Sequence, residues 1–105
     1  ELVDLYPTLA DLAGLKPNGP LDGVSLAPML KDPAATVKDA AFTQVRNGYS
    51  IRTDRWRYVE WAGGEQGAQL YDMDSDPAET TNLAKEAQHA ATVNDLRARL
   101  AAYRR

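Results

Sequence analysis

Leucines recur at helical spacing from the start of the chain. The positions concerned are Leu2, Leu5, Leu9 and Leu12. A spacing of three or four residues predicts an α-helix with one apolar face. Pro7 fits a first turn, which makes Asp4 the expected N-cap, and Gly14 ends the helix. Val3, Tyr6, Ala10 and Ala13 make the apolar face of this helix wider than that of a free surface helix. We therefore expect a part of the protein outside this sequence to cover one side of the helix.

The same pattern of cap and proline recurs once, after an irregular Pro-Asn-Gly-Pro stretch at 17–20. Ser25 is the expected N-cap, Pro28 lies in the first turn, and the short helix ends near Lys31. Asp32-Pro33 stops it, because the residue before a proline avoids helical geometry.

Four segments then carry the aromatic and β-branched residues that favour strands. They are residues 40–46, 49–53, 55–62 and 68–73. Thr53-Asp54 and the glycine-rich residues 63–67 mark reversals, and Pro77 stops the last strand. The predicted fold is an antiparallel sheet of about four strands. Large side chains alternate onto both faces, as in a sheet that is covered on both sides.

A final helix is predicted over 86–103, with its apolar face formed by Val93, Leu96, Leu100 and Tyr103. Packed on the sheet, it gives an α+β layer with the N-terminal helices ahead of it. Residues 1–38 are expected to form a helical segment, and 39–105 a compact subdomain.

Composition indicates that this layer belongs to something larger. The 105 residues are 44% hydrophobic, but 17 of those hydrophobic residues are alanine, so the core is thin. We expect marginal stability in isolation. The chain has no cysteine and a net charge of −3, and no apolar run long enough for a membrane span. We expect neither a membrane nor a nucleic-acid partner.

Few residues suggest chemistry. Asp72, Asp74 and Asp76 begin like a calcium loop, but Pro77 and Leu83 stand where that loop needs glycine and glutamate, so turn capping is favoured. The arginines among the strand aromatics favour structural pairing, and His89 has no indicated partner and is expected at the surface. Gln44 and Arg46, late on a strand before a turn, are our candidates for substrate contacts.

The chain resembles the C-terminal region of the type I, formylglycine-dependent sulfatases of the alkaline-phosphatase superfamily. Within them it is most similar to iduronate-2-sulfatases and their bacterial relatives. The matching residues are 1–9, 12–15, 21–26, 48–53, Trp56-Arg57-Tyr58, Leu70-Tyr71, 74–77 and Asn82.

The resemblance implies a hydrolase of sulfate esters on a small molecule or glycan. Its nucleophile, the formylglycine, and its calcium ion would lie in a preceding large domain, and its compartment would be periplasmic, extracellular or lysosome-like. It implies no catalytic residue, metal ligand or cofactor within 1–105. The chain would complete the fold, wall the substrate cleft and be inactive alone. Residues 1–38 would form the junction with the large domain.

Two further points qualify this interpretation. Residues 75–79, Ser-Asp-Pro-Ala-Glu, follow the Cys/Ser-x-Pro-x-Arg formylglycine motif except that Glu79 replaces its arginine. They also stand far from the motif's place in the family, so the match is interpreted as coincidence. The alternative hypothesis is a free-standing α+β module that binds an anionic polymer through its aromatic and arginine side chains.

Overall fold

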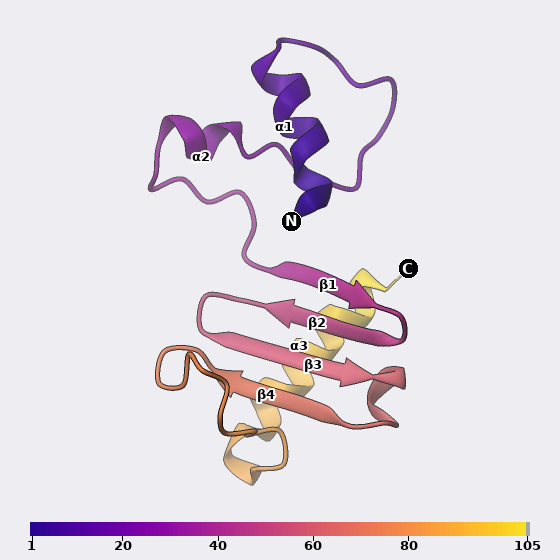
Figure 1. Ribbon diagram of the computed structural model, residues 1–105, viewed down its shortest axis with the longest axis vertical. Coiled ribbons are helices and arrows are strands. Elements are labelled where there is room, and N and C mark those ends of the chain that lie inside the picture. Colours follow the sequence, from indigo (N-terminus) through magenta and orange to yellow (C-terminus); the bar gives the residue numbers. More distant parts are fainter. Residues whose placement is uncertain (105) are drawn as a thin grey trace. The chain divides into compact units, whose positions relative to one another are not determined.

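The computed structural model describes residues 1–104 and separates into two compact units, Glu1–Asp39 and Ala40–Arg105. The first contains only helices and loops, and the second contains the sheet and the C-terminal helix (Figure 1). Each unit is described by itself below. Together they confirm the predicted α+β class.

In the first unit, a 3₁₀ turn at Leu2–Asp4 leads into helix α1, Leu5–Leu12, and a second short helix, α2, spans Ala27–Lys31. Gly14 follows α1 with a φ of 68°, and the N–H of Leu15 donates to the Ala10 carbonyl at 2.8 Å. A glycine in the left-handed region is the common way to end a helix. The predicted end of the first helix is therefore confirmed.

Asp4 precedes α1 as predicted, but its carboxylate does not cap that helix. It is fully buried and accepts hydrogen bonds from the Val24 N–H at 2.9 Å and the Lys38 ammonium at 2.6 Å. Burial by itself would raise the pKa of Asp4, but these bonds outweigh it and hold the pKa at about 2. The side chain thus fastens the following loop to the helix. Sequence spacing gave no indication of this long-range role.

The loop before α2 is fastened by two further side chains. Thr8 donates from its hydroxyl to the Asp4 carbonyl at 2.6 Å and accepts from the Leu26 N–H at 2.9 Å. Ser25 was expected as the N-cap of α2, but Leu26 occupies that position. The Ser25 hydroxyl still accepts from the Ala27 N–H at 3.2 Å and donates to Asp11 at 2.6 Å. Ser25 therefore caps the turn from one residue further out and ties it to α1.

The leucine face of α1 remains exposed. Leu2 is 86% exposed and Leu9 is 65% exposed, and Leu5 and Leu12 are also more than half exposed. We call these four residues the leucine stripe. Its exposure confirms that α1 has a wider apolar surface than the described residues bury.

The second unit is an antiparallel sheet with strand order β1-β2-β3-β4 (Figure 1). The strands are β1, Ala41–Val45; β2, Gly48–Arg52; β3, Trp56–Trp61; and β4, Ala68–Asp72. In the register, Ile51 lies opposite Tyr58, and Tyr58 lies opposite Leu70. These three side chains therefore form a row across one face, and all three are fully buried.

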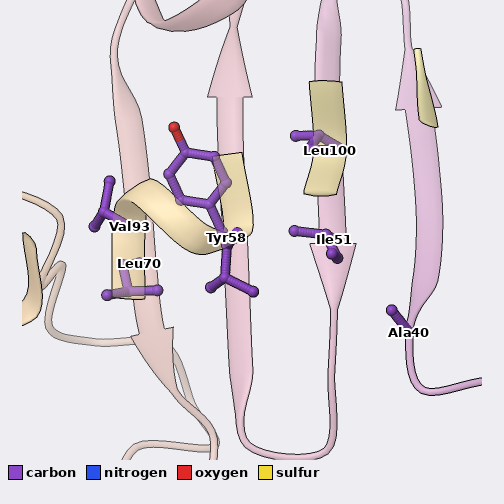
Figure 2. Close-up of a cluster of buried hydrophobic side chains, with 7 residues drawn as sticks. Ala40, Ile51, Tyr58, Leu70, Val93 and Leu100 are labelled. Carbon is purple, nitrogen blue, oxygen red and sulfur yellow. The ribbon is translucent and has the colours of Figure 1, made fainter. Parts of the chain in front are cut away.

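Helix α3, Ala90–Tyr103, covers that row after a 3₁₀ turn at Ala87–His89. Val93, Leu96 and Leu100 are its buried residues, as the predicted apolar spacing required. Figure 2 shows Val93 and Leu100 beside Ile51, Tyr58 and Leu70. Only one face of the sheet is covered by an element of this unit. The expected cover on the second face is not provided by the elements of residues 40–104.

The outer edge of the last strand, β4, is hydrogen-bonded to a side chain from the loop that follows it. Asn82 accepts from the Leu70 N–H at 3.0 Å and donates to the Ala68 carbonyl at 3.2 Å, and the Leu83 N–H donates to the Leu70 carbonyl at 2.8 Å. An exposed strand edge invites pairing with another chain, so this contact protects β4. Within residues 1–104 no helix is long and apolar enough to span a membrane.

Candidate functional site

The two predicted substrate contacts lie together at the β1–β2 turn. Val45 pairs with Gly48, so Arg46 and Asn47 form a two-residue hairpin loop. The Gln44 side-chain amide donates to the Arg46 carbonyl at 3.2 Å, and both side chains are exposed. Arg46 forms none of the ion pairs found among residues 1–104. Its guanidinium is therefore available to an anion.

The backbone at Arg46 is strained. Its φ is 56°, in the left-handed region that residues with a Cβ adopt at a cost of about 1–2 kcal/mol. A hairpin turn with positive φ at its first central residue but not at its second usually has glycine at the first, and Asn47 does not have positive φ. An arginine in this position is therefore costly for stability. Such strain persists where a side chain has another use or where neighbouring contacts hold the backbone.

Contacts from Asn47 join this turn to the loop between β3 and β4. The Ala62 N–H donates to the Asn47 carbonyl at 2.9 Å, and the Asn47 amide donates to the Gln66 side chain at 3.1 Å. The loop contains residues 62–67 and several backbone positions with positive φ. Two turns that are distant in sequence are thus fixed at one end of the sheet.

A buried carboxylate lies at the same end. Glu60 on β3 is 2% exposed, and it accepts hydrogen bonds from the Tyr58 hydroxyl at 3.0 Å and from Arg104 at 2.6 Å. The Arg97 Nε lies 3.6 Å from Glu60 and donates to the Tyr58 oxygen at 3.1 Å. We call these four residues the Glu60 cluster. It fastens α3 to β3.

Burial raises the pKa of Tyr58, and the adjacent Glu60 raises it further, whereas Arg97 acts in the opposite direction. The tyrosine is thus kept neutral and can donate to Glu60. Arg104 also lies over the Tyr49 ring, with its guanidinium carbon 4.1 Å from the ring centre. Tyr49 is the register partner of Gln44, so the Glu60 cluster reaches the predicted site.

This end of the sheet carries three arginines, Arg46, Arg97 and Arg104, against the carboxylates Glu60 and Glu65. Exposed donors with a positive balance suit an anionic ligand. Among residues 1–104, we find no nucleophile with an adjacent general base at this end. The arrangement offers positively charged donors to an anion. Sequence reasoning missed the Glu60 cluster, although Glu60 alternates with Trp56 and Tyr58 on the core side of β3.

The aspartates that resemble a calcium loop have other partners. Asp72 accepts three hydrogen bonds from Arg55, and the shortest, from Nη2, is 2.7 Å long; these bonds lower the pKa of Asp72. Asp76 accepts from the Thr80 N–H at 3.0 Å and the Thr81 N–H at 2.8 Å. Turn capping is confirmed for Asp76, and for Asp72, which also accepts from the Asp74 N–H at 3.2 Å. No group of three possible metal ligands is found among residues 1–104.

The remaining candidates also have structural roles. Glu79, which replaces the arginine of the formylglycine motif, forms an ion pair with Arg57 at 2.9 Å. His89 lies against Trp56 in an edge contact with ring centres 5.5 Å apart. Arg55 lies over the Trp56 ring at 4.7 Å. The expected structural use of the arginines and aromatics is confirmed at these positions.

Comparison with known proteins identifies the family. Residues 1–105 match the family described as N-sulphoglucosamine sulphohydrolase, C-terminal. The chain is 36% identical over 110 residues to the Delta 4,5-hexuronate-2-O-sulfatase of Bacteroides thetaiotaomicron, covering 96% of this chain and 23% of that protein. It is 34% identical over 102 residues to arylsulfatase K of Mus musculus, covering 82% of this chain and 18% of that protein.

A solved structure of a 2-O GAG sulfatase superposes with a TM-score of 0.80 at 33% identity, covering 95% of this chain and 23% of that one. The chain therefore spans about a fifth of the length of the proteins it matches. The predicted resemblance to sulfatases is confirmed, while the finer likeness to iduronate-2-sulfatases stays a prediction. The chain belongs to the family of C-terminal regions of N-sulphoglucosamine sulphohydrolases, within the sulfatases.

Proposed function

We propose that this chain forms the C-terminal part of a sulfatase that hydrolyses sulfate esters on a small molecule or glycan. The match of residues 1–105 to a C-terminal sulfatase family is the observation that carries the proposal. In this role residues 1–38 form the junction with a preceding large domain, and 39–105 complete the fold and wall one side of the substrate cleft. The compartment proposed with it is periplasmic, extracellular or lysosome-like.

The exposed leucine stripe supports this role. Four leucines along the 3₁₀ turn and α1 are each more than half exposed, and exposed apolar side chains gathered on one element mark a contact with another protein segment. A free-standing module would bury such a stripe. For this reason we favour the sulfatase part over the alternative, a separate module that binds an anionic polymer.

The formylglycine and the calcium ion proposed for the whole enzyme would lie outside residues 1–105. This chain's own residues would contribute binding. Arg46 and Gln44 are proposed as contacts to the anionic substrate, because both are exposed at the turn and Arg46 is held at a strained φ of 56°. A charged hydrogen bond of this kind contributes about 1.5–3 kcal/mol.

The activity is tested on the complete gene product and on residues 1–105 alone. The complete protein should release sulfate from an aryl sulfate or a 2-O-sulfated hexuronate, and residues 1–105 alone should release none. Turnover by the 105-residue chain contradicts the proposal. So does a complete protein that releases no sulfate while residues 1–105 alone bind a sulfated polymer.

The site is tested by Arg46→Gly and Arg46→Gln in the complete protein. Both remove the charge and should raise KM for the sulfated substrate about tenfold or more. Only the glycine variant relieves the strain, for a net gain of about 0.5–1 kcal/mol after glycine's own entropy cost. An unchanged KM in both variants rules out Arg46 as a substrate contact, whatever their melting temperatures.

A further inference from the structure

The chain contains the dipeptide Asn-Gly twice, as Asn18-Gly19 in the loop between α1 and α2 and as Asn47-Gly48 at the β1–β2 turn. Asparagine is a chemically labile residue. It is most labile before glycine, whose lack of a side chain leaves its own backbone nitrogen unhindered. We propose that Asn18 is a site of spontaneous deamidation in the folded protein, and that contacts at the end of the sheet protect Asn47 from the same reaction.

The reaction needs only water and involves no oxidation or reduction. The backbone nitrogen of Gly19 loses its proton and attacks the side-chain carbonyl carbon of Asn18, which forms a new C–N bond. The bond from that carbon to the side-chain nitrogen breaks, and ammonia leaves with the proton. Water then opens the resulting succinimide ring at either of its carbonyls, which gives aspartate or isoaspartate. The fold controls the rate, because the attacking nitrogen and the side-chain amide must be free to meet.

Both groups are free to meet at Asn18. Asn18 and Gly19 are exposed and form a bend between Pro17 and Pro20. Among residues 1–104, neither the Asn18 side chain nor the Gly19 N–H takes part in a hydrogen bond. A Cβ added at Gly19 would have no atom within 4 Å apart from its chain neighbours. The packing of this loop therefore does not oppose ring closure.

The loop is fastened at its two ends but not between them. At one end the Leu15 N–H donates to the Ala10 carbonyl at 2.8 Å, and at the other the Val24 N–H donates to the Asp4 carboxylate at 2.9 Å. Within the described part of the chain, residues 16–22 take part in no backbone hydrogen bond. Isoaspartate lengthens the backbone by a methylene group, and a stretch without such bonds can absorb it. The modified protein should therefore keep its fold.

At Asn47 the same two groups are held apart. The Asn47 side-chain amide donates to the Gln66 side chain at 3.1 Å, and the Asn47 carbonyl accepts from the Ala62 N–H at 2.9 Å. Gly48, whose nitrogen would attack, is buried and paired with β1 in the sheet. A Cβ added at Gly48 would lie 2.5 Å from the Trp61 ring, so that ring covers the glycine closely. Attack at Asn47 therefore requires local opening of the hairpin.

A related pair in the first loop, Asp22-Gly23, could close the same kind of ring with loss of water. Gly23 is packed against the backbone of the 3₁₀ turn, since a Cβ added there would lie 2.1 Å from the Val3 carbonyl oxygen. This contact leaves no room for a rearranged backbone. Isomerisation of an aspartate also leaves the mass of the chain unchanged, whereas deamidation of Asn18 increases it. Mass spectrometry therefore separates the two reactions.

The test follows both asparagines in the complete gene product during incubation at neutral pH. Tandem mass spectrometry of tryptic peptides assigns the mass change, because residues 1–31 and 47–52 each hold a single asparagine. In the folded protein Asn18 should react about tenfold or more faster than Asn47, whose reaction waits for local opening. In urea the two rates should agree within about threefold, because both dipeptides are then unfolded.

Two variants separate the chemistry from the protection. In Gly19→Ala the added methyl hinders the attacking nitrogen and should slow the reaction at Asn18 severalfold. The loop accepts this methyl, because Gly19 does not have positive φ and the space beside it is open. Gln66→Ala removes the acceptor of the Asn47 amide and should speed the reaction at Asn47 by about two- to tenfold. It should leave the rate at Asn18 unchanged.

Equal rates at the two asparagines in the folded protein overturn the inference. So does a reaction at Asn18 that is about tenfold or more slower in the folded protein than in urea, because a contact from outside this chain would then protect the loop. A difference that persists in urea also overturns it, since flanking sequence would then decide the rate.

The product adds one negative charge to a chain whose formal net charge is −3, so ion exchange separates it from the unmodified protein. Its melting temperature should lie within about two degrees of the original, and a larger drop contradicts the tolerance of the loop. Sulfate release is not the readout, so a failure of the proposed function leaves this test intact.

Discussion

Removal of the buried charge at Glu60 is expected to loosen α3 from the sheet. The substitution Glu60→Gln keeps the shape of the side chain and removes the carboxylate that Arg104 and Arg97 share. Tyr58 also loses a charged acceptor. Each of these groups is then left beside a neutral amide that satisfies at most part of their hydrogen-bonding needs.

The expected magnitude follows from the exposure of the partners. Breaking a buried ion pair by removing one member costs about 3–5 kcal/mol. Glu60 is 2% exposed, but Arg97 and Arg104 are 47% and 29% exposed, so water regains part of their solvation. We therefore expect a loss of about 2–3 kcal/mol in the free energy of unfolding. For a unit of this size that lowers Tm by about ten degrees or more.

The assay is urea unfolding of the purified protein followed by tryptophan fluorescence, with Glu65→Gln as the matched control. Glu65 is an exposed carboxylate in the neighbouring loop, and surface substitutions of this kind change stability by at most about 0.5 kcal/mol. A loss at Glu60 as small as that of the control would refute the assignment of the cluster as the contact that holds α3. In that case, a double-mutant cycle that combines Glu60→Gln with Arg104→Met should also show no coupling energy between the two residues.

Two further predictions concern hydrogen bonds that fix loops. The pKa of Asp4 is held at about 2 against an ordinary value of 3.8, so the ionised carboxylate stabilises the first unit by about 2 kcal/mol above pH 4. This stability should be lost as the pH falls from about 4 to 2. Asp4→Asn should abolish the acid transition, which is followed by hydrogen exchange at Val24. Asn82→Ala leaves the Leu70 N–H without its acceptor and should lower the free energy of unfolding by about 1–3 kcal/mol. The Leu70 amide should exchange faster in this variant than in Asn94→Ala, a control at an exposed position of α3. Equal exchange in the two variants contradicts the edge protection of β4.

The sequence by itself determined the elements and their order. The leucine spacing indicated α1, the positions of the aromatic residues indicated four strands, and Val93, Leu96 and Leu100 indicated the buried face of α3. These predictions succeed because helix and strand periods are local properties of the chain. The resemblance of residues 48–53 and 74–77 to sulfatases was also visible in the sequence, since it depends on residue identity alone.

Only the tertiary structure decided which polar groups meet. Asp4 appeared to be a helix cap but binds Val24 and Lys38, which are 20 and 34 residues away. Glu60 was not among the candidates from the sequence, yet it is buried beside Arg97 of α3 and Arg104, which follows that helix. The physical reason is that a carboxylate's partner depends on which side chains the packed backbone brings within about 3 Å. No spacing along the chain encodes that distance.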